Sequence, residues 1–277
     1  MFQLGKVKFL SQAETLLLRY GIEKPAEIDL EALAWALGAR VKYSQLDSCE
    51  ARIVGIGDKA IITVDDTRVN PQRARYSLGH EIGHWQRHRG EVLFCSKEHI
   101  ESGGKNVPRK EREADKYCAE LIMPKFMFYP MARSFTKLSF AAVDALAEAF
   151  KTSRMATAIR YINMDIVPSM IICYGTNGRE WFFPSGSWPS NWIPKRELDH
   201  DSEAFNFVFG HSMERQHRSV CPASVYFNGA DADRFEVWEH SIPTGGRGTA
   251  NRQALTLLEV KTSSMMDARD HWTDTRY

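Results

Sequence analysis

Apolar residues in the first part of the chain are spaced first as in short helices and then as in strands. Between residues 13 and 37 they recur every three or four positions, which is the spacing of a helix with one buried face. A turn at Pro25 divides this stretch into two helices, and Asp29 stands where the second helix needs a capping side chain. Residues 40–65 are rich in β-branched side chains and are broken at residues 55–58, so they predict strands with a turn between them.

Two longer helices are predicted next. Asn70 and Pro71 supply an N-cap and a proline at the first helical position, and apolar residues at helical spacing continue to Arg87. After a polar stretch a second helical pattern begins at Arg109, and Pro124 ends it. The two helices are close in sequence, so they can pack side by side.

The rest of the chain changes character at Pro168. Before it, helical patterns at residues 138–150 and 153–162 are separated by a short break, as in a helix-turn-helix unit. After it the apolar residues form short β-type runs, at residues 170–174, 180–183, 205–209 and 223–227. We therefore predict an α+β fold in three parts: a domain at residues 1–130, a helix-turn-helix-like segment at residues 131–165 and a C-terminal α+β domain at residues 166–277.

Composition narrows the classes of partner and compartment. The 36 Lys and Arg residues face 35 Asp and Glu residues, so the formal charge of +1 gives no overall attraction to nucleic acid or to an anionic membrane. The 5 cysteines are scattered singly, which argues against a disulfide framework and a cysteine zinc site and suits a reducing compartment. The first residues lack the apolar core of a signal peptide, and no run of about 18 apolar residues occurs. We expect a cytoplasmic protein without a membrane span.

The residues with the most specific chemistry are His80-Glu81-Ile82-Gly83-His84. Residues four apart lie on one face of a helix, so the two histidines can aim their rings at one metal ion. Glu81 then lies beside the metal without binding it, which is the position of a general base in a metallopeptidase. The spacing therefore predicts a catalytic zinc site on this helix.

Such a site needs a third protein ligand. The metzincin class would require a glycine and a histidine where this chain has Arg87 and Gly90, so that class is excluded. His88 extends the row formed by His80 and His84, but three ligands along one straight helix cannot surround one ion. We assign His88 a structural or surface role and look for a carboxylate on another helix.

The helix that begins at Arg109 offers three carboxylates. Glu111 and Asp115 are four residues apart on one face, so one can bind the metal while the other holds a ligand histidine through its second ring N–H. Glu113 points about 160° away from Glu111, which leaves it as the runner-up ligand.

Together these residues resemble the bacterial ImmA/IrrE metallopeptidases. In that family an HExxH helix is followed by a helix with the pattern E-x-x-A-[N/D] that ends in a Leu-x-Met-Pro-like sequence. Residues 80–84 and 111–124 match this pattern, and the resemblance covers roughly residues 10 to 130. It implies a zincin-like fold with His80, His84 and Glu111 as Zn²⁺ ligands and Glu81 as general base. Asp115 is left beside the ligands, and Mn²⁺ could replace Zn²⁺ where it dominates.

The resemblance also implies a biological role. The family's best-understood members cut a helix-turn-helix repressor and so release stress-response or mobile-element genes, and some members carry a helix-turn-helix segment and a GAF-like sensor domain after the peptidase. Residues 139–163 and 168–277 could correspond to these parts. We expect a zinc endopeptidase that cleaves a specific cytosolic protein, such as a helix-turn-helix repressor.

Several alternatives stay open at this stage. The chain could be a DNA-binding or sensor regulator with a structural or inactive zinc site, although Asp144 and Glu148 oppose the basic residues Arg154 and Arg160. The strand at residues 60–64 could present an exposed edge to a substrate or be an interior strand. Tyr76 is one candidate donor to the oxyanion.

Overall fold

The structure of the protein is a computed structural model. It describes residues 10–47, 49–67, 70–90, 108–210, 217–229, 231–244 and 252–267. The chain divides into two compact units, which are residues 1–131 with 146–154 and residues 132–145 with 155–277. The predicted division into three parts stays a prediction.

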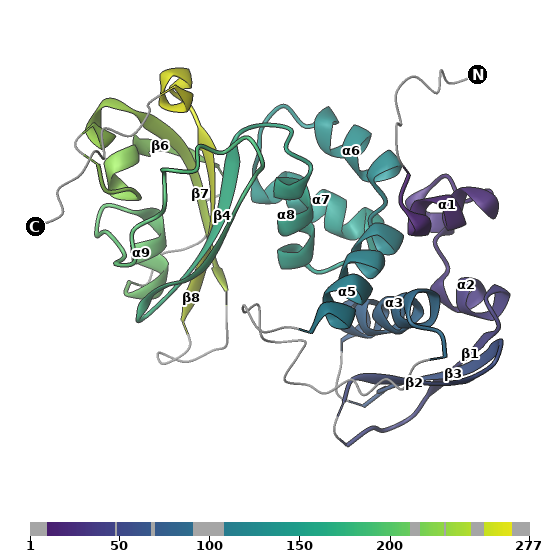
Figure 1. Ribbon diagram of the computed structural model, residues 1–277. Helices are drawn as coiled ribbons and strands as arrows, with labels where there is room; N and C mark the ends of the chain where they lie inside the picture. Colours follow the sequence, from purple (N-terminus) through teal and green to yellow (C-terminus); the bar gives the residue numbers. More distant parts are fainter. Residues whose placement is uncertain are drawn as a thin grey trace, which may run out of the picture. The chain divides into compact units, whose positions relative to one another are not determined.

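The first unit combines helices with a three-stranded sheet (Figure 1). Its elements are α1 (Gln12–Arg19), the 3-10 turn η1 (Pro25–Glu27), α2 (Leu30–Ala36), β1 (Ala39–Tyr43), β2 (Ala51–Ile56), β3 (Lys59–Val64), α3 (Pro71–Arg87) and α5 (Arg109–Ile122). The residues of three further helices are shared between the two units, and these helices are α6 (Lys125–Ser134), α7 (Phe140–Phe150) and α8 (Arg154–Asn163).

Side-chain caps set the beginnings of the helices in this unit. The carboxylate of Asp29 accepts hydrogen bonds of 3.0 Å from the N–H groups of both Glu31 and Ala32, at the start of α2. The side chain of Asn70 accepts from the N–H of Arg73 at 2.8 Å, with Pro71 at the first position of α3. Both predicted caps are therefore confirmed, and each satisfies N–H groups that a helix leaves unpaired at its start.

The small sheet has the order β1-β3-β2, with β3 parallel to β1 and antiparallel to β2. Strand β3 is thus the central strand, and both of its edges are paired. The alternative in which residues 60–64 offer a free edge to a substrate is wrong, because that edge is taken up by β1 and β2. Among the described strands of this sheet, the outer ones are β1 and β2.

Helix α3 packs on this sheet through Trp85. A Cβ added at Gly55 would lie 2.6 Å from the Trp85 ring, so the absence of a side chain in β2 makes room for the indole. The indole N–H donates to the carbonyl of Leu37 at 2.8 Å, and Trp85 is 3% exposed. Ile82 is fully buried on the same helix. Ile82 and Trp85 therefore belong to the buried side of α3, as the apolar spacing of this helix predicts.

Helix α5 packs closely against α3 at Gly83 (Figure 1). A Cβ at Gly83 would lie 2.8 Å from the carbonyl oxygen of Ala114 and 3.1 Å from its Cα. These are backbone atoms, so a larger residue would push the two helices apart. At Gly79 the closest atom is instead the Sγ of Cys118, also at 2.8 Å.

We expect Gly83→Ala to lower the stability of the metal-free protein. Alanine gains about 1 kcal/mol over glycine in a helix interior, but overpacking costs about 1–3 kcal/mol, and here the clash is with backbone that cannot rotate away. Gly79→Ala is the matched comparison and should cost less, because a thiol can move. Thermal unfolding of the three proteins measures this, and a Gly83→Ala protein as stable as the parent would contradict it.

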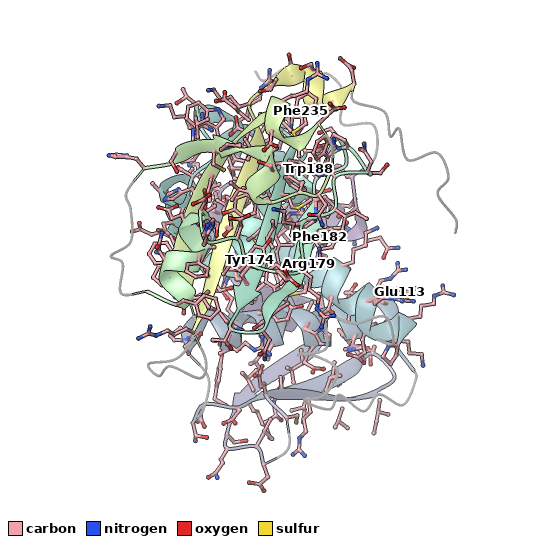
Figure 2. The ribbon with its side chains drawn as sticks, turned by 90° about the vertical axis from the view of Figure 1, so that its left-hand side faces the viewer. Glu113, Tyr174, Arg179, Phe182, Trp188 and Phe235 are labelled. Carbon is pink, nitrogen blue, oxygen red and sulfur yellow. The ribbon has the colours of Figure 1, made fainter. Side chains whose placement is uncertain are left out.

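The second unit contains a five-stranded antiparallel sheet of order β5-β4-β8-β7-β6 (Figure 1). Helix α9 (Glu203–Val208) packs against β7 and β8. The core is rich in aromatic residues, among them Tyr174, Trp188 and Phe235, which are labelled in Figure 2. The strands are β4 (Ser169–Gly175), β5 (Gly178–Pro184), β6 (Ser219–Pro222), β7 (Glu236–Thr244) and β8 (Gln253–Val260), and the 3-10 turns are η2 (Ala223–Val225), η3 (Ala232–Arg234) and η5 (Ser263–Met266).

Two of the four β-type runs predicted in this unit are wrong. Residues 205–209 lie mostly in α9, because Ser202 caps a helix by accepting from the N–H of Phe205 at 3.1 Å. The residues that α9 buries are spaced as on a helix face, with Ala204, Phe207 and Val208 at i, i+3 and i+4. The run at residues 223–227 begins with the 3-10 turn η2. The runs at 170–174 and 180–183 are confirmed as β4 and β5.

The overall class, a mixed α+β fold, is confirmed. The zincin-like and GAF-like descriptions stay predictions. Within the described residues, the helices are too short or too polar for any of them to cross a lipid bilayer.

Candidate metal centre

Helices α3 and α5 bring three of the predicted site residues together. His80 and His84 lie one turn apart on α3, and Glu111 lies in the first turn of α5. All three are buried, with exposures of 2%, 0% and 8%. Ionisable side chains are rarely buried unless they are paired or bind a metal, so this cluster calls for a chemical explanation.

The three side chains point their ligand atoms at one another. The Nε2 atoms of His80 and His84 are 3.0 Å apart. The Oε2 of Glu111 lies 3.1 Å from the Nε2 of His80 and 3.4 Å from the Nε2 of His84. Ligands held at about 2.0–2.1 Å by a tetrahedral Zn²⁺ are about 3.3 Å apart. The donor set and its separations fit a zinc ion with a position left for a further ligand.

The electrostatics of this triad suit a cation. Burial acts to raise the pKa of Glu111, but the hydrogen bonds from His80 and His84 outweigh it and hold the pKa below its ordinary value. The carboxylate is therefore ionised at neutral pH. An ionised carboxylate beside two imidazole nitrogens is a common ligand set for zinc.

The second ring nitrogen of His80 is fixed by Asp115. Its Nδ1 lies 2.8 Å from the Oδ1 of Asp115, and the same oxygen accepts the hydroxyl of Tyr76 at 2.5 Å. Burial is the main cause that raises the pKa of Tyr76, so the phenol stays protonated and donates. This contact leaves Nε2 of His80 to face the triad. The hydroxyl of Tyr76 is committed to Asp115, which argues against Tyr76 as the oxyanion donor.

The second ring nitrogen of His84 is fixed by a chain of contacts that sequence reasoning missed. Its Nδ1 lies 3.2 Å from the Nδ1 of His88, and the Nε2 of His88 lies 3.1 Å from the Oε2 of Glu113. Glu113 in turn accepts from the Nε of Arg109 at 2.7 Å. His88 is only 4% exposed. The i+4 spacing of His84 and His88 was a signal for this contact.

These contacts change the roles considered for Glu113 and His88. Glu113 is not among the residues whose ligand atoms converge, and its carboxylate is taken by His88 and Arg109. Glu113, the runner-up ligand of the sequence analysis, is therefore outside the triad and contacts it only through His88. Of the two roles considered for His88, the structural one fits its burial.

We expect His88→Ala to weaken zinc binding about 10–100-fold, which is the usual cost of losing the outer partner of a metal-bound histidine. The reason is that His84 would lose the contact that orients its ring. A fluorescent zinc indicator in competition with the protein measures the affinity. His217→Ala is the matched control, since His217 is exposed and belongs to neither group of potential ligands. Equal zinc affinity in the His88→Ala and His217→Ala proteins would contradict the expectation.

Glu81 is placed on α3 between the two histidines and is 1% exposed. It does not belong to the convergent group of His80, His84 and Glu111. A buried carboxylate next to a metal site, but outside its ligands, is what general-base chemistry on a water molecule requires.

A second group of potential ligands occurs in the other unit. Asp199, His200 and Asp201 are consecutive residues, and the side chains of His200 and Asp201 are 77% and 74% exposed. Exposed acidic groups of this kind are common without an ion. The buried group on α3 and α5 is the stronger candidate.

Comparison with known proteins gives a family match and a fold match. Residues 34–161 match a peptidase family model described as the IrrE N-terminal-like domain. A solved structure named Mycobacterium tuberculosis transcriptional regulator is similar, with a TM-score of 0.57 over 96% of this chain and 91% of that chain. At 13% sequence identity this second match shows a likeness of fold. The search of curated proteins finds no match.

The family match includes both helices of the candidate metal centre. It begins within α2, covers α3 and α5 and ends within α8, so it extends past residue 130 into the helices that follow. It agrees with the resemblance inferred from the sequence motifs. The match supports the assignment of residues 34–161 to the ImmA/IrrE metallopeptidase family.

Proposed function

We propose that the protein is a zinc-dependent endopeptidase whose metal is held by His80, His84 and Glu111. The observation that carries the proposal is the convergence of these three buried side chains, whose ligand atoms all lie within 4.8 Å of one another. The triad falls inside the region that matches a peptidase family. Mn²⁺ is the alternative metal, because the same nitrogen and oxygen donors also accept it.

Each nearby residue then has a defined task in peptide hydrolysis. Bound zinc would supply a Lewis acid that makes water a better nucleophile and polarises a carbonyl. Glu81 takes the proton from the attacking water and passes it to the leaving amine, as a general base and then a general acid. Asp115, supported by Tyr76, holds the ring of His80 so that Nε2 faces the metal.

The proposed substrate is one specific cytosolic protein, with a helix-turn-helix repressor as the first candidate. The family resemblance supports this substrate. The second unit also supports it, because a separate sheet and helix are not needed for hydrolysis and could recognise a partner or a signal. A cytoplasmic location and a role in a stress or mobile-element response belong to the same proposal.

The alternative hypothesis, that the protein is a DNA-binding regulator, has less support. A recognition helix needs an exposed face whose side chains reach the bases. In α8 only Met155 and Asn163 are exposed, while Arg154 and Arg160 are partly buried and engaged in other contacts. A structural zinc site would also be closed by a fourth protein ligand and would have no use for Glu81.

The experiment that tests the substrate proposal compares newly formed N-termini in a cell extract. The active protein and its Glu81→Gln variant are added to equal portions of extract with zinc present. We expect one dominant cleavage, in a DNA-binding protein, that appears only with the active protein, and low activity on casein. Broad cleavage of many proteins would indicate a housekeeping peptidase instead. No cleavage under any inducing condition would favour the regulator with a structural zinc.

A further inference from the structure

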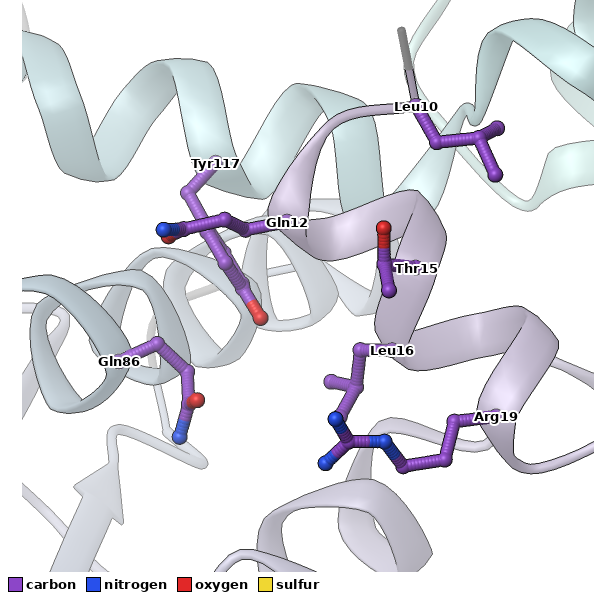
Figure 3. A pocket seen from close by; sticks show the side chains of 7 residues that line it. All are labelled: Leu10, Gln12, Thr15, Leu16, Arg19, Gln86 and Tyr117. Atoms are coloured by element: carbon purple, nitrogen blue, oxygen red, sulfur yellow. The ribbon is translucent and has the colours of Figure 1, made fainter. Parts of the chain in front are cut away.

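A cavity of about 340 Å³ lies between α1 and the two helices of the candidate metal centre, within the first unit (Figure 3). One wall comes from α1 and the residue before its cap, and the other comes from one residue each of α3 and α5. The lining residues are Leu10, Gln12, Thr15, Leu16, Arg19, Gln86 and Tyr117. The volume is at the small end of the range for ligand pockets, about 300–1,000 Å³. None of the candidate metal ligands lines it.

Among the lining side chains, those of Gln86, Tyr117 and Arg19 present hydrogen-bond donors. The Nε2 of Gln86 is buried and has no hydrogen-bond partner among the described residues. Burial raises the pKa of Tyr117 to about 12, so its hydroxyl keeps its proton at neutral pH. Arg19 brings a guanidinium, and Figure 3 shows its side chain reaching in from α1 toward the side of the pocket where Gln86 lies. A buried donor without an acceptor is costly, so this arrangement favours an occupant that accepts hydrogen bonds.

The pocket lining offers few hydrogen-bond acceptors. The Oε1 of Gln12 accepts from the Nη1 of Arg87 at 2.6 Å, which leaves its amide N–H₂ as a donor. Thr15 donates its proton to the carbonyl of Ser11 at 2.8 Å, so its hydroxyl oxygen is left as an acceptor. No carboxylate is among the lining residues. Donors therefore outnumber acceptors, and the one formal charge on the lining is positive.

We propose that this pocket binds a small organic carboxylate, paired with Arg19 and hydrogen-bonded by Gln86 and Tyr117. A planar guanidinium suits a carboxylate because two parallel N–H···O contacts can form. Leu10 and Leu16 supply an apolar surface for the carbon part of the ligand. Recognition of this kind, with an apolar wall and a few placed polar groups, is typical of small-molecule sites.

The position of the pocket gives the ligand a role other than that of substrate. Gln86 follows His84 by two residues on α3, and Tyr117 follows Asp115 by two residues on α5. A carboxylate bound here would connect α1 to the two helices that carry the candidate metal ligands. The ligand would thus be an effector, and its binding does not depend on peptidase activity.

Isothermal titration of the full-length protein tests the proposal. The probes are phenylacetate, succinate and citrate, with phenylacetamide as the neutral isostere of phenylacetate and inorganic phosphate as a different anion. We expect saturable binding of at least one carboxylate. If that carboxylate is phenylacetate, phenylacetamide should bind at least ten-fold more weakly, because it carries no charge for Arg19.

Variants identify the site. We expect Arg19→Gln to lower the affinity for the carboxylate at least ten-fold and Tyr117→Phe to lower it several-fold. Arg112→Gln is the matched control and should leave affinity unchanged, since Arg112 is an exposed arginine of α5 outside the pocket lining. Gln86→Leu is a second test should Arg19→Gln disturb folding, and it should show the same loss.

Several outcomes would overturn the proposal. One is that none of the three carboxylates binds, and another is that phosphate alone binds. A third is that the affinity is the same in the parent, Arg19→Gln and Gln86→Leu proteins. Equal binding of phenylacetate and phenylacetamide would show that the pocket does not recognise the charge of the ligand, and the proposal depends on that recognition.

Discussion

Replacing Glu81 with glutamine is expected to reduce peptide-bond cleavage by about 10²–10⁴-fold, the usual contribution of a positioned general base. Glutamine has nearly the same shape but cannot take a proton from water. Glu81 is 1% exposed and lies outside the convergent ligand group, so the change should leave the metal ligands in place. Metal content, thermal stability and cleavage of the substrate found in cell extract measure the three effects separately.

The control for this prediction is a second carboxylate beside the same centre, that of Asp115, which contacts His80. Asp115→Asn should reduce cleavage mainly through weaker zinc binding, so added zinc should restore part of its activity. Glu81→Gln should show no such rescue, because its metal site is intact. Unchanged turnover in the Glu81→Gln protein would exclude the proposed role of Glu81 as base.

The common face of the two candidate histidine ligands could be predicted because it depends on local geometry. His80 and His84 are four residues apart on a helix that Asn70 and Pro71 begin, and that spacing fixes their common face without knowledge of the tertiary structure. The same periodicity set Glu111 and Asp115 apart from Glu113, and the family resemblance implied that Glu111 is the ligand. The sequence identified the candidate ligands. The structure adds that Gly83 lets α5 come close enough to α3 for Glu111 to meet His80 and His84.

The parts that could not be predicted depend on contacts between distant or competing elements. The link from His84 through His88 to Glu113 joins two helices, and sequence gave no means to choose between a buried and a surface His88. Four of the five residues at 205–209 are apolar, which suggested a strand, but the capping side chain of Ser202 and burial at helical spacing favour a helix. Tertiary context of this kind overrides local pattern.

The extent of the family match also goes beyond the sequence motifs. The motifs suggested a resemblance over roughly residues 10 to 130, whereas the family model covers residues 34–161 and thus includes α7 and most of α8. Tyr161 of α8 is buried, and its hydroxyl donates to the carbonyl of Ala132 in α6 at 3.1 Å. The helices after α5 therefore pack as part of the folded chain, which fits a packing role better than a free DNA-reading segment.

Replacing Glu111 with glutamine is expected to lower zinc affinity by more than about 100-fold, a larger loss than the 10–100-fold typical of outer partners. The carboxylate is the only anionic member of the convergent group, and its pKa is held below the ordinary value by the histidines it contacts. An amide oxygen in its place would carry no charge to offset that of the ion. Equilibrium dialysis followed by metal analysis measures the occupancy.

Glu113→Gln is the matched control for that experiment, because Glu113 lies on the same helix and contacts a histidine that is not in the ligand group. It should keep one equivalent of zinc, with at most the moderate weakening expected when His88 loses a charged partner. The two variants separate a ligand from a positioning residue, since both remove one carboxylate from α5 but only one removes an atom of the triad. If Glu113→Gln lost the metal while Glu111→Gln kept full occupancy, the third ligand would be Glu113, and the packing of α5 against α3 would have to differ by about half a helical turn.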